Sequence, residues 1–324
     1  MGHRVITREQ HRIHVVLRET EESKPTTATN VPASSLYDKR IPNHQKQILL
    51  QCMEELNQLV GLHDIKQFVT EIYALLEIGR QREMAGLASE HQVLHMVFKG
   101  NPGTGKTTVA RILGRLFRDM GVLSEGHLIE VERADLVGEY IGHTAQRTRE
   151  WVKKALGGIL FIDEAYSLAR GGEKDFGREA VDTLVKAMED DKNRFILILA
   201  GYPLEMEQFL LSNPGLPSRF PIQITFPDYS IEELMDIANA MLAERQYRMT
   251  VEAKQKLRQY VLEKEKNGFD QNFGNAREIR NQIEKAIRSQ AYRLLQTPEP
   301  TRDQLMLIEA CDLQMDREQR SYLV

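Results

Sequence analysis

The feature that most constrains this chain is a glycine-rich run, Gly100-Asn101-Pro102-Gly103-Thr104-Gly105-Lys106-Thr107. The run fits the pattern G-x-x-x-x-G-K-[ST] at every fixed position. An apolar run typical of a strand, residues 93–98, precedes it, and residues 109–117 follow with helical spacing. Between a strand and a helix, the backbone N–H groups of such a loop and the N-terminus of the helix can surround a phosphate group. The sequence therefore predicts a phosphate-binding loop (P-loop) within an α/β fold.

The side chains of the P-loop predict how it would hold a nucleotide. Lys106 would reach the β and γ phosphates, and the hydroxyl of Thr107 would ligate Mg²⁺. The expected contacts come from Asn101, Pro102, Gly103, Thr104, Gly105, Lys106, Thr107 and Thr108. A glycine-rich turn beside a surface lysine is the alternative, and the flanking strand and helix argue against it. The loop alone would suit a kinase, a GTPase or a motor.

A second apolar run, residues 157–162, ends in two carboxylates, Asp163 and Glu164. A continuous apolar run suits a parallel strand that helices cover on both faces. Ligands of such sheets bind at the carboxyl ends of the strands, where this pair would lie. We expect Asp163 to hold the Mg²⁺ shell, usually through water, and Glu164 to polarise the water that attacks the γ-phosphate. Two carboxylates that only cap a helix are the alternative.

The residues before the P-loop have the pattern of two amphipathic helices, over 45–59 and 64–78. We expect Asp64 to cap the second helix and Gly79 to end it. Between the helices lies an apolar strip suited to clasp an adenine ring, formed by Val60, Gly61 and Leu62. A plain turn between helices is the alternative.

Past the P-loop, residues 133–142 have the pattern of a turn and an exposed loop, and residues 194–202 form a third buried strand. A turn that contains Pro and Gly, residues 213–221, then holds Arg219. An arginine positioned in this way is a candidate to reach the γ-phosphate of a neighbouring subunit. An ordinary surface arginine is the alternative.

From residue 229 the chain has only helical patterns, over 231–245, 250–264 and 275–295. We expect Asn275 to cap the last helix and to place Arg277 in its first turn, where the charge can point back at the nucleotide. A solvated helix arginine is the alternative. The predicted parts are a flexible arm (1–45), an α/β domain (46–228), a helical domain (229–312) and a polar tail (313–324).

Composition indicates which partners and which compartment suit this chain. A net charge of −4 argues against a duplex-DNA-binding surface, which needs a dense field of Lys and Arg. The two cysteines, Cys52 and Cys311, have no metal-ligand spacing, so we expect a reducing compartment. No apolar run approaches the ~18–20 residues of a membrane span, and the N-terminus lacks the apolar core of a signal peptide. We therefore expect a cytoplasmic protein.

Several motifs, in this order along the chain, resemble those of the AAA+ ATPases. They are residues 100–107, 139–144, 159–166, 199–203, 213–216 and 274–277. Over roughly residues 46–312 the chain is similar to the subfamily that contains stage V sporulation protein K and the red-type Rubisco activases, and the sporulation protein is the nearer match. The resemblance implies a P-loop NTPase fold with a parallel sheet between helices, followed by a small all-α lid. It also implies ATP and Mg²⁺ as ligands.

The resemblance assigns roles to matching residues. It makes Arg219 the arginine finger that acts on the next subunit and Arg277 the sensor 2 residue of the lid. It makes Tyr140 and Ile141 a pore loop that grips a polypeptide in the channel of a hexamer. At the end of the third strand the chain departs from the family, because many AAA+ proteins have a polar sensor 1 residue where this chain has Ala200-Gly201-Tyr202.

The expected function is therefore a hexameric ATPase that remodels a protein substrate, with sporulation as the expected setting. A red-type Rubisco activase is one alternative, and an assembly switch that binds ATP without threading a polypeptide is another. A nucleic-acid motor is disfavoured by the acidic charge and by an aromatic, rather than basic, pore loop.

Overall fold

The computed structural model describes residues 43–88, 92–140, 142–170, 176–213, 215–266 and 273–314. The chain divides into two compact units, each of which is described by itself. The first holds the residues up to Glu54 together with 69–99 and 110–224, and the second holds 55–68, 100–109 and the residues from Thr225 onward. Nearly all of the predicted arm (1–45) and of the predicted tail (313–324) lies outside the described residues.

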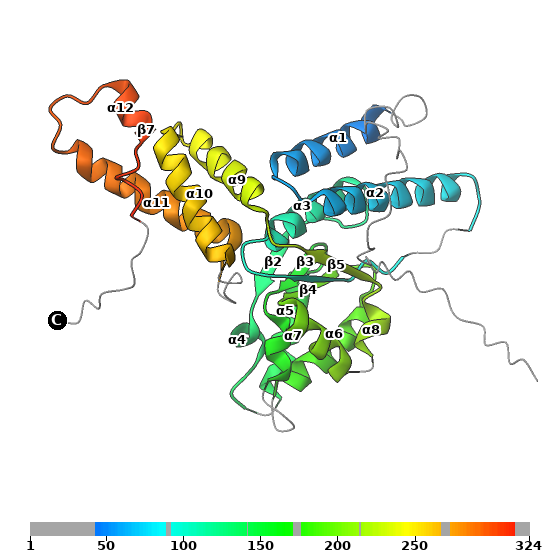
Figure 1. Ribbon diagram of the computed structural model, residues 1–324. Helices are drawn as coiled ribbons and strands as arrows, with labels where there is room; N and C mark the ends of the chain where they lie inside the picture. The colour runs from blue at the N-terminus through cyan, green and yellow to red at the C-terminus, as the bar shows by residue number, and fades with distance from the viewer. Residues whose placement is uncertain are drawn as a thin grey trace, which may run out of the picture. The chain divides into compact units, whose positions relative to one another are not determined.

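A five-stranded sheet forms the centre of the first unit (Figure 1). Its strand order is β2-β3-β4-β1-β5. The strands are β1 (Met96–Gly100), β2 (Leu128–Val131), β3 (Ile159–Ile162), β4 (Ile196–Gly201) and β5 (Ile222–Phe226). β4 pairs in parallel with β1 and with β3, and β3 also pairs in parallel with β2. Every residue of β3 and β4 is buried, as the continuous apolar runs predict.

Helices cover both faces of this sheet. The helices that lie wholly or partly in the first unit are α1 (Asn43–Gln58), α2 (His63–Met84), α3 (Lys106–Asp119), α4 (Arg133–Leu136), α5 (His143–Lys154), η2 (Ala165–Ala169), α6 (Gly177–Asp190), α7 (Pro203–Ser212) and α8 (Leu216–Arg219). On one face, Leu160 of β3 shares a buried cluster with Val152 of α5 and Leu184 of α6. On the other face, α3 approaches so closely that a Cβ on Gly114 would lie 3.4 Å from Cδ1 of Ile159. The predicted sandwich of a parallel sheet between helices is confirmed.

The prediction that Gly79 ends the second helix is wrong, because α2 continues to Met84. The carboxylate of Glu77 accepts hydrogen bonds from Arg80 and Gln81 and so supports the turn that follows Gly79. Gly86 ends the helix instead, with φ +71° and with the N–H of residue 87 bonded to the carbonyl of Arg82 at 2.9 Å. This is the usual left-handed glycine cap, and it lies about two turns later than the sequence suggests.

Several short elements escape the sequence prediction, and β5 and α4 are two of them. β5 is an edge strand of five residues whose alternation, Ile-Gln-Ile-Thr-Phe, is weak beside the apolar runs. α4 is a single turn at 133–136, where a loop is expected. It is stabilised by reciprocal bonds between Glu132 and Asp135, a local capping box that lacks the usual Ser or Thr.

The second unit contains most of the predicted helical domain. Its elements are α9 (Ile231–Glu244), β6 (Arg248–Met249), α10 (Val251–Lys266), α11 (Asn275–Leu294), α12 (Arg302–Met306) and β7 (Leu307–Ile308). The Ser230 hydroxyl accepts from the N–H of Glu233, so a capping box starts α9. The short parallel pair β6-β7 is a departure from an all-α arrangement. Arg293 binds Asp312 through two bonds of 2.9 and 2.8 Å and fixes the last described segment to α11.

Across the described ranges, none of the helices is both long enough and apolar enough to span a membrane.

Candidate nucleotide site

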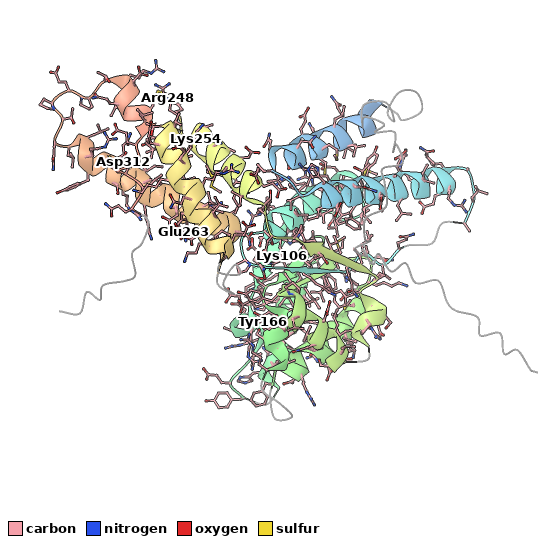
Figure 2. All side chains as sticks on the ribbon, in the orientation of Figure 1. Lys106, Tyr166, Arg248, Lys254, Glu263 and Asp312 are labelled. Atoms are coloured by element: carbon pink, nitrogen blue, oxygen red, sulfur yellow. The ribbon has the colours of Figure 1, made fainter. Side chains whose placement is uncertain are left out.

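The P-loop has the backbone that its glycines predict. Gly103 and Gly105 have φ values of +72° and +97°, which glycine adopts without steric cost. Lys106 is the first residue of α3 (Figure 2), and its Nζ donates to the carbonyls of Gly100 at 2.8 Å and Asn101 at 2.9 Å. Thr107, half-buried, follows in the first turn. The ammonium is therefore held at the loop itself, close to where a phosphate would lie.

The apolar strip 60–62 lies beside the P-loop within the second unit. Leu62 is buried with a positive φ of 55°, and its Cδ1 would be 3.6 Å from a Cβ on Gly105. The Nζ of Lys66 donates to the carbonyl of Leu59 at 2.8 Å and closes the turn that presents Gly61. The sequence predicted an adenine contact here, and the position next to the loop is compatible with that prediction.

The start of α11 also contacts the P-loop. A Cβ on Gly103 would meet the carbonyl oxygen of Gly274 at 2.1 Å and the N–H nitrogen of Arg277 at 2.8 Å. Arg277 lies in the first turn of α11, as predicted, and its side chain is exposed. Gly103 thus needs to be glycine both for its φ value and because the backbone of the lid occupies the space of a side chain.

The prediction that Asn275 caps α11 is wrong. Gly274 occupies the cap position, and no side chain caps the helix. Asn275 is fully buried with φ 47°, and its amide bonds to Asp228, to the Pro102 carbonyl and to the N–H of Tyr229. The side chain cannot fold back on its own helix because it links other segments of the second unit.

The two carboxylates follow β3 in the first unit. The Oδ1 of Asp163 accepts from the N–H of Glu164 at 3.0 Å, and the N–H of Asp163 donates to the carbonyl of Val131 at 3.1 Å. Glu164 is exposed and left-handed, with φ 46° and ψ 43°. Such a conformation costs a non-glycine residue about 1–2 kcal/mol and is found preferentially at functional sites.

The strands that precede the two motifs have the same direction in the sheet. β1 and β3 each run parallel to β4, so their carboxyl ends lie at the same edge of the sheet. The P-loop continues directly from β1, and Asp163 continues from β3. Ligands of parallel sheets bind outside this edge.

The end of β4 explains the missing sensor 1 side chain. A Cβ on Gly201 would lie 2.7 Å from the ring of Tyr166 and 2.9 Å from the sulfur of Met206. Tyr166, labelled in Figure 2, is buried beside Tyr202 with ring centroids 6.0 Å apart. Burial, aided by the charge of Glu164, raises the pKa of the Tyr166 phenol to about 12, so the phenol is neutral near pH 7. A polar side chain at 201 has no room because a tyrosine occupies that place.

Arg219, the last residue of α8, is held by its own chain. Its Nη1 donates to the carbonyl of Gly215 at 2.8 Å, and its Nη2 pairs with the carboxylate of Glu189 on α6. Within the described ranges, its Nε is buried without a hydrogen-bond partner. The N–H of Gly215 bonds to Oδ1 of Asn213 at 2.9 Å, which fixes the turn before the helix. Glu189 was not found by the sequence reasoning, because no motif marks it.

Tyr140 is presented on the loop between α4 and α5. Its side chain is 64% exposed and meets the ring of His143 edge-on at 5.3 Å between centroids. The base of the loop is anchored by the buried hydroxyl of Thr144, which accepts from the N–H of Gly138 at 2.9 Å. The other predicted pore-loop residue, Ile141, lies outside the described residues.

Comparison with known protein families gives the same assignment as the motifs. Residues 96–228 match the profile of the ATPase family associated with various cellular activities (AAA), and residues 230–321 match the AAA lid domain. The chain belongs to the AAA ATPases. Its fold and its relatives make it an enzyme that hydrolyses ATP.

Three relatives show which members of the family this chain resembles in sequence. The chain is 55% identical to stage V sporulation protein K of Bacillus subtilis, over 90% of this chain and 91% of that protein. It is 49% identical to protein CbbX of Cereibacter sphaeroides, over 75% of this chain and 79% of the relative. It is 45% identical to the chloroplastic ribulose bisphosphate carboxylase/oxygenase activase of Cyanidioschyzon merolae, over 80% of this chain and 89% of that protein.

Among solved structures, the chain resembles the RuvB Holliday junction branch migration motor of Thermotoga maritima, with a TM-score of 0.50. The two share 18% sequence identity, and the match covers 78% of this chain and 67% of the RuvB chain. This likeness concerns the fold alone.

Proposed function

We propose that this AAA ATPase assembles as a hexamer and uses ATP hydrolysis to remodel a protein substrate. The observation that carries the proposal is the exposed ring of Tyr140 on a loop whose base is fixed at Thr144. An aromatic side chain held out from an anchored loop can grip a polypeptide of any sequence, because its contact is apolar and non-specific. AAA proteins generally form hexamers, in which such loops from all subunits would face one channel together with Ile141.

In the proposed site the P-loop, residues 101–108, binds the phosphates of ATP, and Val60, Gly61 and Leu62 contact the adenine. The left-handed glycines and the placement of Lys106 support this assignment. Thr107 and Asp163 would hold Mg²⁺, since hydroxyl and carboxylate oxygens are the ligands that this ion prefers. When bound, Mg²⁺ neutralises charge on the phosphate oxygens.

Hydrolysis in this proposal depends on three further side chains. Glu164 accepts a proton from the attacking water, and its exposed, left-handed position leaves its carboxylate unshielded by the first unit. Arg277 contacts the nucleotide from the lid. Arg219 from the next subunit stabilises charge on the γ-phosphate, and Glu189 holds the guanidinium until a phosphate takes its place. Loss of the γ-phosphate then releases both arginines, which allows the lid and the pore loop to move.

The names of the relatives suggest two settings for this activity. We propose a role in sporulation, because the sporulation protein K match spans nearly the whole of both chains. A red-type Rubisco activase is the second candidate, supported by the similarity to the Cyanidioschyzon merolae activase. The two cysteines without metal-ligand spacing support a cytoplasmic location.

Capture of substrates by Glu164→Gln tests the proposal. The variant should bind ATP and assemble without turnover, and it should retain proteins from native lysate that mass spectrometry identifies. Tyr140→Ala should abolish capture and remodelling and leave ATP hydrolysis within about twofold of wild type. Tyr292→Ala, which removes a ring that is 70% exposed on the lid, is the matched control and should change neither.

Retention of remodelling in Tyr140→Ala would favour an assembly switch that does not thread a polypeptide. Rubisco among the captured proteins would favour the activase. Salt-sensitive DNA binding by wild type would instead favour a nucleic-acid motor.

A further inference from the structure

One carboxylate in the second unit joins the P-loop to two segments of the lid. Oδ1 and Oδ2 of Asp228 accept from Nδ2 of Asn101 at 3.0 and 2.8 Å. Oδ1 also accepts from Nδ2 of Asn275 at 2.8 Å. Asn101 belongs to the P-loop, Asp228 precedes α9, and Asn275 begins α11.

The amide of Asn275 has further fixed partners. Its Nδ2 donates to the carbonyl of Pro102 at 3.3 Å, and its Oδ1 accepts from the N–H of Tyr229 at 3.1 Å. The side chain is fully buried in a left-handed backbone position, which Asn tolerates better than most residues. The hydroxyl of Tyr229 adds a second link, because it donates to the carbonyl of Thr104 at 3.3 Å. Residues 228, 229 and 275 are thus bonded to three residues of the P-loop, namely Asn101, Pro102 and Thr104.

We infer that Asp228 is a positioning residue for ATP hydrolysis, which acts through Asn101 and Asn275. The inference rests on the proposed nucleotide site at the P-loop. Because Asp228 holds Asn101 and Asn275 at once, a shift of the P-loop on nucleotide binding shifts the first turn of α11. Arg277 lies two residues after Asn275 and moves with that turn. Nucleotide binding and the position of Arg277 are therefore coupled.

The chemistry of the junction requires a carboxylate. Both partners present amide N–H groups, and the three short bonds need acceptors on both oxygens of residue 228. Asparagine at 228 would offer one acceptor oxygen and would turn its own N–H groups toward a donor. An exchange of the two residues, Asp228→Asn with Asn275→Asp, would restore donor and acceptor pairing between them.

The test uses the full-length protein and two measurements for each variant. The first is the kcat and KM of ATP hydrolysis, and the second is hydrogen exchange of residues 275–283 with and without ADP. In wild type, ADP should slow exchange in this segment. Asp228→Asn should bind a fluorescent ADP analogue within about threefold of wild type, lose the ADP-dependent protection and lose about tenfold in kcat. Asp236→Asn, an exposed aspartate on α9, is the matched control and should behave as wild type.

The exchanged pair separates positioning from simple destabilisation. Asn275→Asp alone sets two carboxylates together and should lower kcat more than Asp228→Asn does. The double variant should recover at least threefold in kcat over Asn275→Asp, which a purely additive loss of stability would not produce. If Asp228→Asn is poorly folded, Asn101→Ala removes the same link from a partly exposed side chain and should lose the same protection.

The inference is overturned if Asp228→Asn keeps both the ADP-dependent protection of 275–283 and a kcat within twofold of wild type. It is also overturned if exchange rises equally with and without ADP, since that describes a general loosening of the lid. Failure of wild type to bind the ADP analogue would refute the proposed nucleotide site itself. The two failures are therefore distinguishable.

Discussion

Two glycines with nearly the same backbone allow a sharp test of how the lid contacts the P-loop. Gly103 has φ +72°, and Gly86, at the end of α2, has φ +71°. A Cβ on Gly86 would meet nothing within 4 Å, whereas a Cβ on Gly103 would lie 2.1 Å from the carbonyl oxygen of Gly274. Substitution by alanine therefore adds the same backbone strain at both positions and a collision at only one.

The expected magnitudes follow from this difference. The left-handed backbone costs alanine about 1–2 kcal/mol relative to glycine at either position. A carbon and a carbonyl oxygen normally stay about 3.3 Å apart, so Gly103→Ala must separate two backbone segments by roughly 1 Å. Overpacking of this kind adds about 1–3 kcal/mol. We expect Gly86→Ala to cost about 1–2 kcal/mol in total and Gly103→Ala about 2–5 kcal/mol, with the excess falling on the contact between the P-loop and the lid.

Thermal unfolding and ATPase kinetics measure the two effects. Each kcal/mol corresponds to about 2–4 °C in the midpoint for a domain of 150–250 residues. Gly86→Ala should lower the midpoint by a few degrees and leave kcat/KM unchanged. Gly103→Ala should lower kcat/KM for ATP at least tenfold, which is equivalent to about 1.4 kcal/mol. Wild-type kcat/KM in Gly103→Ala, or an equal loss in both variants, would refute the reasoning.

Three further predictions concern the base, the neighbouring subunit and pH. Glu164→Gln should keep ATP affinity and lose about 10²–10⁴-fold in turnover, and a loss below tenfold in a quenched ATPase assay would contradict its assignment as the base. Arg219→Ala and Lys106→Ala should each be inactive alone and regain activity when the two variants are mixed. In a mixed oligomer, the intact Lys106 of an Arg219→Ala subunit can adjoin the intact Arg219 of a Lys106→Ala subunit. No recovery on mixing would exclude action between subunits. Burial lowers the pKa of His95 from its usual 6.5 to about 4. As pH falls below 6.5, His95 therefore takes up a proton in the unfolded chain and stays neutral in the folded chain. The free energy of unfolding should therefore drop by about 2 kcal/mol from pH 7 to pH 5, and urea midpoints with the same pH slope in His95→Gln would contradict this.

Much of the fold could be predicted because its signals are local. The runs that became β3 and β4 are apolar at every position, and such runs have few stable arrangements other than a covered parallel sheet. The capping box at Ser230 is likewise readable within four residues. The end of α2 was placed wrongly for a physical reason: Glu77 stabilises the turn beyond Gly79 through side-chain bonds that a glycine rule does not consider.

The chemistry of the P-loop was also contained in the sequence. Gly105 and Lys106 are required by the loop itself, so their spacing is visible without any tertiary contact. The roles of Asp163, Glu164 and Arg219 stay predictions, since they concern a bound nucleotide and a neighbouring subunit. Their conformations, a left-handed Glu164 and an Arg219 paired with Glu189, became visible only in the folded chain.

The sequence by itself determined that a P-loop follows a buried strand and that a helical lid follows the sheet, because periodicity and glycine spacing act over a few residues. Only the tertiary structure decided what the variable positions of the loop do. Asn101 occupies a position that the motif leaves free, yet it shares Asp228 with Asn275, a residue far along the chain that a local rule assigns to a helix cap. Hydrogen bonds between distant segments leave no periodic trace in a sequence, so the junction between the P-loop and the lid had to be found in space.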